Sequence, residues 1–178
     1  MKILVLGDIH GLAHWKDITS KENYDLVIFL GDYVSTHGLV TEKAQIDNLE
    51  EILQFKENNP DNVILLRGNH DLESLGYYWA ECYPSTGHVV KDYMRYNKER
   101  FLNNTQWIYL YKNICFSHAG VSSVWMKRNN LSKLEEINDL EPSEKFAFTP
   151  CKMSDYSGIS VTQPPSMDKT LYFNRLCL

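Results

Sequence analysis

The sequence predicts an α/β fold whose amino-terminal core alternates strand, helix, strand, helix and strand. Short apolar runs at Lys2–Gly7, Leu26–Leu30 and Val63–Leu66 are typical of strands buried in a parallel sheet. Between them, Gly11–Asn23 and Thr41–Asn59 carry apolar residues at helical spacing. These strands and helices form two consecutive βαβ units, whose crossovers are expected to be right-handed.

Polar side chains stand directly after these strands. The strand at Val63–Leu66 leads into Arg67-Gly68-Asn69-His70-Asp71, where the glycine allows a sharp turn. The side chains after such a turn lie at the carboxyl end of the strand, where open α/β sheets bind their ligands. The same arrangement recurs at three other predicted strand ends: Gly7-Asp8-Ile9-His10, Gly31-Asp32 and Ser117-His118.

Asp8, His10, Asp32, Asn69 and His118 are therefore candidate metal ligands. Taken singly, an aspartate after a strand-end glycine is usually a turn or cap residue, and a buried histidine is usually satisfied by the backbone. Their recurrence at four strand ends favours a metal site instead. The mixed oxygen and nitrogen set suits hard or borderline divalent cations such as Mn, Fe or Zn.

The middle of the chain predicts helices and then a hairpin. Helices are expected within Leu75–Asn104, broken around Pro84–Gly87. Trp107–Tyr111 and Ile114–Phe116 flank a short turn and predict a β-hairpin, which places His118 just past its second strand.

The last third gives weaker signals. Ser122–Asn130 predicts a short helix capped by its serine, and Ser132–Glu135 has a capping-box pattern that opens another helix to about Leu140. From Glu141 onward the chain predicts no regular element. Met167–Leu178 alternates apolar and polar residues with no identifiable partner, and it could leave apolar surface that favours self-association.

Composition indicates an ordinary soluble globular protein. With 178 residues, 43% of them hydrophobic, we expect a single domain over residues 1–178. The net charge of -5 and the lack of a basic block argue against a dedicated nucleic-acid or anionic-membrane binder. No apolar run is long enough for a signal peptide or a membrane span, so a cytoplasmic location is expected. The cysteines have no C-x-x-C spacing and are expected to be free thiols: Cys82, Cys115, Cys151 and Cys177.

The motif order resembles the metallophosphoesterase, or calcineurin-like phosphoesterase, superfamily. The resemblance rests on Asp8-x-His10, Gly31-Asp32, Gly68-Asn69-His70-Asp71 and His118, and it covers roughly residues 1–120. Leu65–Asp71 is especially similar to the branch that holds serine/threonine phosphoprotein phosphatases and symmetrical diadenosine tetraphosphatases. The family fold implied is a sandwich of mixed β-sheets flanked by helices, with the βαβαβ core at its amino terminus.

The resemblance also implies a site with two divalent metal ions, manganese being favoured and iron or zinc the alternatives. Asp32 matches the bridging position, Asp8 and His10 match the ligands of one metal, and Asn69 and His118 match those of the other.

Three neighbouring residues receive different roles. His70 matches the family's general acid, which protonates the leaving oxygen and is not a ligand. Asp71 is expected to accept hydrogen bonds within the turn or to support a metal ligand without binding the metal itself. Arg67 precedes the turn, and a structural ion pair is favoured over substrate binding.

Two departures from the family pattern stand out. In the phosphoprotein phosphatase branch the second motif runs Gly-Asp-x-Val-Asp-Arg-Gly, and its second Asp and its Arg orient the catalytic histidine and grip the phosphate. Here Ser35 and Thr36 take those places. The family's final Gly-His-x-His segment has no counterpart after His118, so the chain is expected to be truncated relative to the family.

The expected function is a metal-dependent hydrolysis of phosphate monoesters, of serine/threonine phosphoproteins or nucleotides, so the expected partner is a phosphorylated substrate. One alternative is a phosphodiesterase or dinucleoside polyphosphate hydrolase. The other is a non-catalytic metal-binding remnant that lacks the last metal ligands.

Overall fold

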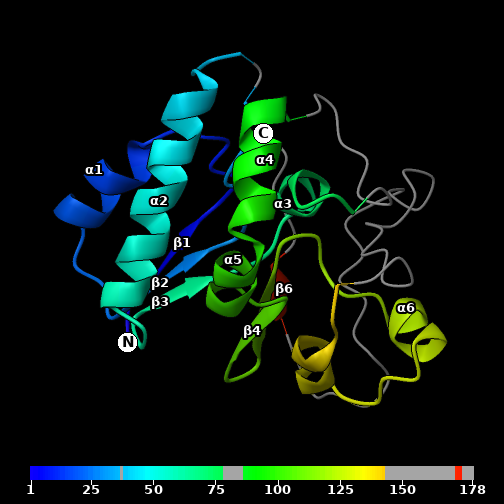
Figure 1. Ribbon diagram of the computed structural model, residues 1–178. Helices are drawn as coiled ribbons and strands as arrows, with labels where there is room; N and C mark the ends of the chain where they lie inside the picture. Colours follow the sequence, from blue (N-terminus) through cyan, green and yellow to red (C-terminus); the bar gives the residue numbers. More distant parts are fainter. Residues whose placement is uncertain (37, 78–85, 143–170, 174–178) are drawn as a thin grey trace. The chain divides into compact units, whose positions relative to one another are not determined.

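The computed structural model describes residues 1–36, 38–77, 86–142 and the backbone of 171–173 (Figure 1). The chain divides into two compact units, Met1–Gln106 and Trp107–Leu178, and each is described by itself. That the 178 residues form a single domain stays a prediction.

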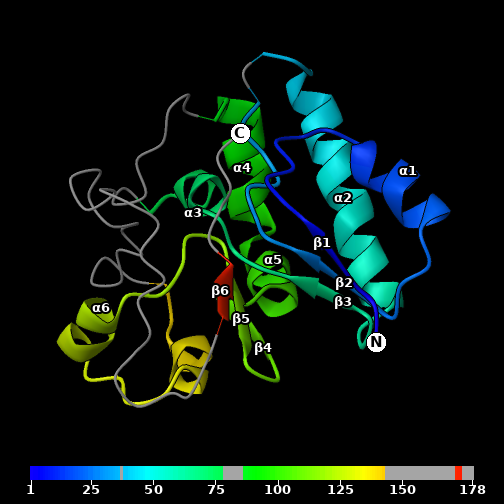
Figure 2. The same cartoon turned by 180° about the vertical axis from the view of Figure 1, so that it is seen from behind.

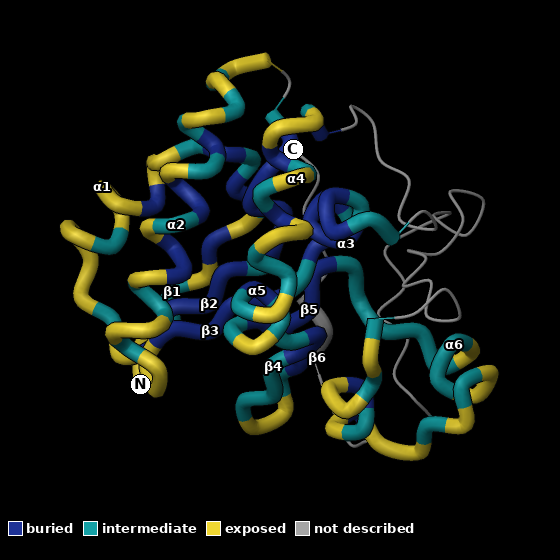
Figure 3. The backbone as a smooth tube through the Cα atoms, in the orientation of Figure 1, coloured by how far each residue is buried: buried dark blue, intermediate teal, exposed yellow. Residues whose placement is uncertain are grey.

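The first unit is built on a parallel three-stranded sheet. Its strands are β1 (Ile3–Leu6), β2 (Leu26–Phe29) and β3 (Val63–Leu65), in the order β1-β2-β3. Ile3 is paired with Leu26, and Val27 is paired with Val63. All four residues of β2 are buried, as Figure 3 shows in dark blue, because the central strand is covered on both faces. The predicted βαβαβ core is confirmed.

Two helices connect these strands. Helix α1 (His14–Lys21) lies within the predicted range, and α2 (Glu42–Asn58) begins after Thr41, whose Oγ1 accepts a hydrogen bond from Ala44 N at 3.2 Å. Figure 2 shows the three strands side by side, next to α2.

The buried face of α2 is partly polar, which the sequence did not predict. Leu49, Ile52 and Leu53 are buried, and Gln45 and Asn48 are buried beside them. Asn48 Oδ1 accepts a hydrogen bond from the Trp15 indole at 2.9 Å. An internal partner therefore compensates for the burial of this amide.

The rest of the first unit is helical. Helix α3 (Asn69–Ser74) starts immediately after Gly68, so the predicted turn after β3 leads directly into a helix. Helices α4 (His88–Tyr96) and α5 (Lys98–Asn104) confirm the helices expected before Asn104. Most of the expected break around Pro84–Gly87 lies outside the described residues, but α4 does begin directly after Gly87.

An ionic cluster joins α2 to α4 and α5. The Arg100 guanidinium lies 2.8 Å from a carboxylate oxygen of Glu50 and 2.8 Å from one of Glu57. Tyr93 also donates its hydroxyl to Glu50, which is half-buried. The hydrogen bonds to Glu57 and Glu50 raise the pKa of Arg100 and keep it charged.

We expect Arg100→Met to lower the free energy of unfolding by about 1 kcal/mol, the upper end for partly exposed ion pairs, because two glutamates lose one shared partner. Urea denaturation of both proteins measures this difference. The control is Lys43→Met, which removes only the exposed pair with Asp47 and is expected to cost about 0.5 kcal/mol or less. Equal losses for the two variants would show that the cluster adds nothing beyond an ordinary surface pair.

The second unit contains the predicted hairpin. Strands β4 (Ile108–Tyr111) and β5 (Ile114–Ser117) pair antiparallel, with Ile108 opposite Ser117. Helix α6 (Ser123–Arg128) follows, and the Ser122 hydroxyl accepts a hydrogen bond from Trp125 N at 3.2 Å. The hairpin and the serine-capped helix are confirmed.

Two expectations for this unit are wrong. The helix expected to open with a capping box at Ser132 is a 3₁₀ helix, η2 (Glu135–Asp139), which begins after Leu134 without a side-chain cap, while the Ser132 hydroxyl donates to Glu136 at 2.8 Å. A strand also lies where none was predicted: β6 (Leu171–Phe173) pairs parallel with β5. Three residues carry too little pattern to reveal a strand whose partner is more than fifty residues earlier. Residues 143–170 and 174–178 lie outside the described part of the chain.

Two smaller expectations concern the cysteines and the membrane. Cys115 is a free, buried thiol, and burial raises its pKa to about 12. The other three cysteines lie outside the described residues. Among the described helices, none is both long and apolar enough to cross a membrane.

Candidate metal centre

The loops after β1 and β2 are tied together by backbone hydrogen bonds. Asp32 O accepts from Ile9 N at 3.1 Å and from His10 N at 2.7 Å. Both His10 and Asp32 have left-handed backbones, with φ of 45° and 55°. A conformation that costs free energy for an L residue is held here by the surrounding loops, which is common at functional sites.

The loop after β3 packs against the Asp32 carboxylate. His70 N donates to Asp32 Oδ1 at 3.0 Å, and a Cβ atom on Gly68 would lie only 2.2 Å from that same oxygen. At Gly31, with φ of 106°, an added Cβ would lie 2.5 Å from Gly68 N. The glycines predicted to make sharp turns are thus needed for close approach, and they bring three strand ends together around a fully buried Asp32.

Asp71 holds two of these loops in place. Its carboxylate accepts backbone hydrogen bonds from Asp32 N at 2.9 Å, Tyr33 N at 2.8 Å and Gly68 N at 2.8 Å. Complete burial and the nearby charge of Asp32 raise the pKa of Asp71, while the three N–H donors act in the opposite direction. Asp71 therefore connects the loop after β2 to the loop after β3.

The ring of His10 has a defined orientation. Nδ1 lies 2.8 Å from Ser35 O and 3.3 Å from Val34 O. A carbonyl oxygen can only accept, so Nδ1 carries the proton and, in the neutral ring, Nε2 presents its lone pair. Nε2 lies 3.9 Å from Asp8 Oδ2 and 3.9 Å from Asp32 Oδ2.

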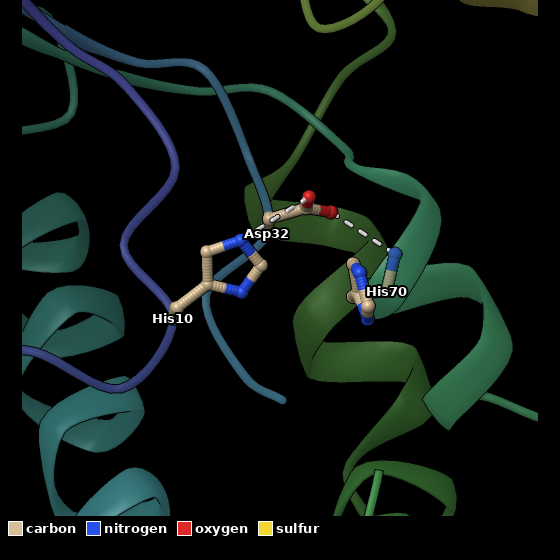
Figure 4. Close-up of side chains that lie close together, drawn as sticks. All are labelled: His10, Asp32 and His70. Carbon is tan, nitrogen blue, oxygen red and sulfur yellow. Dashed lines mark hydrogen bonds and ion pairs between the residues drawn. The ribbon is translucent and has the colours of Figure 1, made fainter. Parts of the chain in front are cut away.

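His70 lies beside this group. The ring centroids of His10 and His70 are 5.1 Å apart, in an edge-to-face arrangement. Figure 4 shows both rings next to the Asp32 carboxylate, His10 from the loop after β1 and His70 from the start of α3. One donor atom from each of the three residues lies within 4.8 Å of the others, a spacing that could hold a metal ion.

The donors fit a divalent cation. A nitrogen lone pair and two carboxylates converge on one place, and in the absence of a positive charge they would repel one another. The imidazole of His10 is also held by a carbonyl at its far nitrogen, which is the usual support for a metal-binding histidine. The residue types and their orientation therefore suit Mn, Fe or Zn.

The other predicted site residues are placed as follows. Asn69 is half-buried at the first position of α3, next to His70. Arg67 donates to Leu102 O at 2.9 Å and to Thr105 O at 2.7 Å, so it anchors the loop after β3 to the end of α5. His118 is buried directly after β5 in the second unit, and its joining of the site stays a prediction.

Sequence reasoning missed two contributors. Ser35 was noted only as the replacement of an acid, whereas its main-chain carbonyl holds His10. Gln45 accepts a hydrogen bond from Ser35 N at 2.9 Å. The available signal was the spacing of Gln45 with Asn48, Leu49 and Ile52, which places it on the buried face of α2.

The chain was compared with known proteins. A probable serine/threonine-protein phosphatase of Encephalitozoon cuniculi is 28% identical over 154 residues, which are 80% of this chain and 32% of the relative. A solved Saccharomyces cerevisiae protein serine/threonine phosphatase, described as similar to human phosphatase PP5, has a TM-score of 0.54 at 19% identity and matches 79% of this chain and 43% of its own. A cold-active protein tyrosine phosphatase has a TM-score of 0.51 at 19% identity, over 78% of this chain and 46% of its own.

These similarities agree with the sequence motifs. The solved structures show that the fold is the predicted one, a mixed α/β architecture with a parallel and a mixed sheet. The chain spans about a third of the curated relative and less than half of either solved chain. The family model for calcineurin-like phosphoesterases matches residues 1–157. By this match, the chain belongs to the calcineurin-like phosphoesterase family.

Proposed function

We propose that this chain is a metal-dependent phosphoesterase that hydrolyses phosphate monoesters. The observation that carries the proposal is the convergence of His10 Nε2 with the carboxylates of Asp8 and Asp32 at 3.9 Å. The family is divalent-metal dependent, which agrees with this donor set.

In this proposal Asp8 and His10 would hold one divalent ion, Asn69 and His118 would hold a second, and Asp32 would be shared by both, with manganese the favoured metal. When bound, the ions would neutralise phosphate charge and lower the pKa of a coordinated water. The chain itself supplies rigid ligand positions. Asp32 is fixed by His70 N, and His10 is fixed by Ser35 O.

His70 is proposed to donate a proton to the leaving oxygen. An alkoxide is a poor leaving group, so a positioned imidazolium N–H that protonates it lowers the barrier. The backbone of His70 is anchored to Asp32, and its side chain is buried beside His10.

Serine/threonine phosphoproteins are the proposed substrate class, supported by the name of the Encephalitozoon cuniculi relative, and nucleotides are the second. One observation favours a different function. Ser35 and Thr36 occupy the places of the aspartate and the arginine in the phosphoprotein phosphatase motif. The Thr36 hydroxyl accepts a hydrogen bond from Leu39 N at 3.1 Å, within its own loop. A metal-binding module without catalysis is therefore the alternative to test.

The test is manganese titration of the metal-free protein, followed by assays with an aryl phosphate and a bis-aryl phosphate. We expect manganese to bind and turnover of the monoester to rise with occupancy. Faster turnover of the bis-aryl phosphate would indicate a phosphodiesterase. Bound manganese with no turnover of either ester would indicate the non-catalytic module, and no manganese binding would contradict the metal-site proposal.

A further inference from the structure

Gln45 is a buried polar side chain that the proposed chemistry does not use. It lies on α2, one turn after the helix begins, and only 6% of its surface is exposed. Its Oε1 accepts a hydrogen bond from Ser35 N at 2.9 Å. A buried amide aimed at the backbone of another segment fixes the position of that segment.

The segment that Gln45 holds is conformationally strained. Ser35 has a φ of 71°, in the left-handed region that residues other than glycine adopt rarely. Such a conformation persists where its surroundings determine it, and the hydrogen bond from Gln45 is one of these determinants.

The strained residue in turn holds His10. The Ser35 N–H donates to Gln45, and the carbonyl of the same residue accepts a hydrogen bond from His10 Nδ1 at 2.8 Å. That contact places the proton on Nδ1 and directs the Nε2 lone pair toward Asp8 and Asp32. A continuous chain of contacts therefore runs from the middle of the first unit to the candidate metal centre.

The space around Gln45 agrees with this arrangement. At Gly11, where φ is 74°, an added Cβ would lie 2.7 Å from Gln45 Cγ and 2.8 Å from Thr36 Cγ2. The absence of a side chain at Gly11, directly after His10, leaves the room in which Gln45 reaches Ser35.

We propose that Gln45 is a positioning residue that selects the Nδ1–H tautomer of His10 through the Ser35 backbone. Its importance for metal affinity rests on the proposed function, whereas its effect on the tautomer does not. Loss of the hydrogen bond would let Ser35 relax and let the His10 ring sample the other tautomer, which cannot present Nε2 to a cation.

The tautomer can be read directly in metal-free protein by long-range ¹H–¹⁵N correlation NMR of the His10 ring. The spectra are recorded at a pH at which the ring ¹⁵N chemical shifts show a neutral imidazole. The variants are Gln45→Met, which has a similar volume but no amide oxygen, and Gln45→Glu, which keeps an acceptor oxygen. Gln54→Met on the exposed face of α2 is the matched control.

We expect the Nδ1–H tautomer in the wild type, in Gln45→Glu and in Gln54→Met, and a tautomer mixture in Gln45→Met. Manganese affinity should fall about 10-fold in Gln45→Met, as for other residues that orient a ligand. An unchanged tautomer in folded Gln45→Met would overturn the proposal, and so would an Nε2–H tautomer in the wild type, a result that requires no variant to fold. Since the NMR measurement involves neither metal nor substrate, its outcome is independent of whether the chain hydrolyses phosphate esters.

Discussion

Asp32→Asn is expected to remove more metal than any other single substitution in the chain. As the proposed bridge, Asp32 is the one carboxylate that would contact both ions, and it is completely buried. We expect manganese affinity to fall by more than the roughly 10–100-fold that is typical of residues outside the ligand set. Metal content after dialysis, measured by elemental analysis, tests this for the wild type and for the Asp8, Asp32, Asn69 and His118 variants.

Asparagine is chosen as the replacement for Asp32 because it can preserve the hydrogen bond that holds the neighbouring loops. Its amide oxygen can still accept the hydrogen bond from His70 N that Asp32 Oδ1 accepts. Asp17→Asn, on the exposed side of α1, makes the same chemical change away from the site and is expected to leave the metal content unchanged. If Asp32→Asn kept its metal while Asp8→Asn lost it, the bridging role would belong elsewhere.

His70→Ala is expected to retain metal but to lose roughly 100-fold or more in turnover, the usual scale for a general acid. The loss should be smallest for esters with good leaving groups, because these depart without protonation. A series of aryl and alkyl phosphates, assayed at saturating manganese, measures this dependence.

The control for that series is His14→Ala, which removes an exposed imidazole at the start of α1. A ring nitrogen of His70 lies within 4.8 Å of donor atoms of both His10 and Asp32, so His70 is also close enough to bind metal. Equal losses for good and poor leaving groups, together with loss of metal, would make His70 a ligand and remove it from the proton-transfer step.

The elements that the sequence predicts well are those with a strong local pattern. The apolar run of β2 and the long amphipathic α2 can be recognised without knowing their neighbours. Strand β6 could not be recognised, because its pairing with β5 joins residues far apart in the chain. Likewise, the capping-box pattern pairs Ser132 with Glu135, and the contact of the Ser132 hydroxyl with Glu136 is visible only in three dimensions.

The same distinction separates the parts of the candidate site. Asp8, His10 and Asp32 could be proposed from sequence because each follows a strand end, and strand ends of a parallel sheet meet at one edge. The carbonyl of Ser35 could not, since every residue has one and only the fold determines which of them His10 contacts. Gln45 was overlooked because its role depends on a loop ten residues earlier with an uncommon backbone conformation.

The central claim, a divalent metal site at the carboxyl edge of the β1-β2-β3 sheet, is tested most directly by anomalous X-ray diffraction. Crystals grown with manganese would be measured on both sides of the manganese absorption edge, which locates the metal without reference to activity. The predicted result is anomalous density in contact with the Asp32 carboxylate and His10 Nε2. Fully occupied manganese elsewhere, with none beside Asp32, would contradict the account.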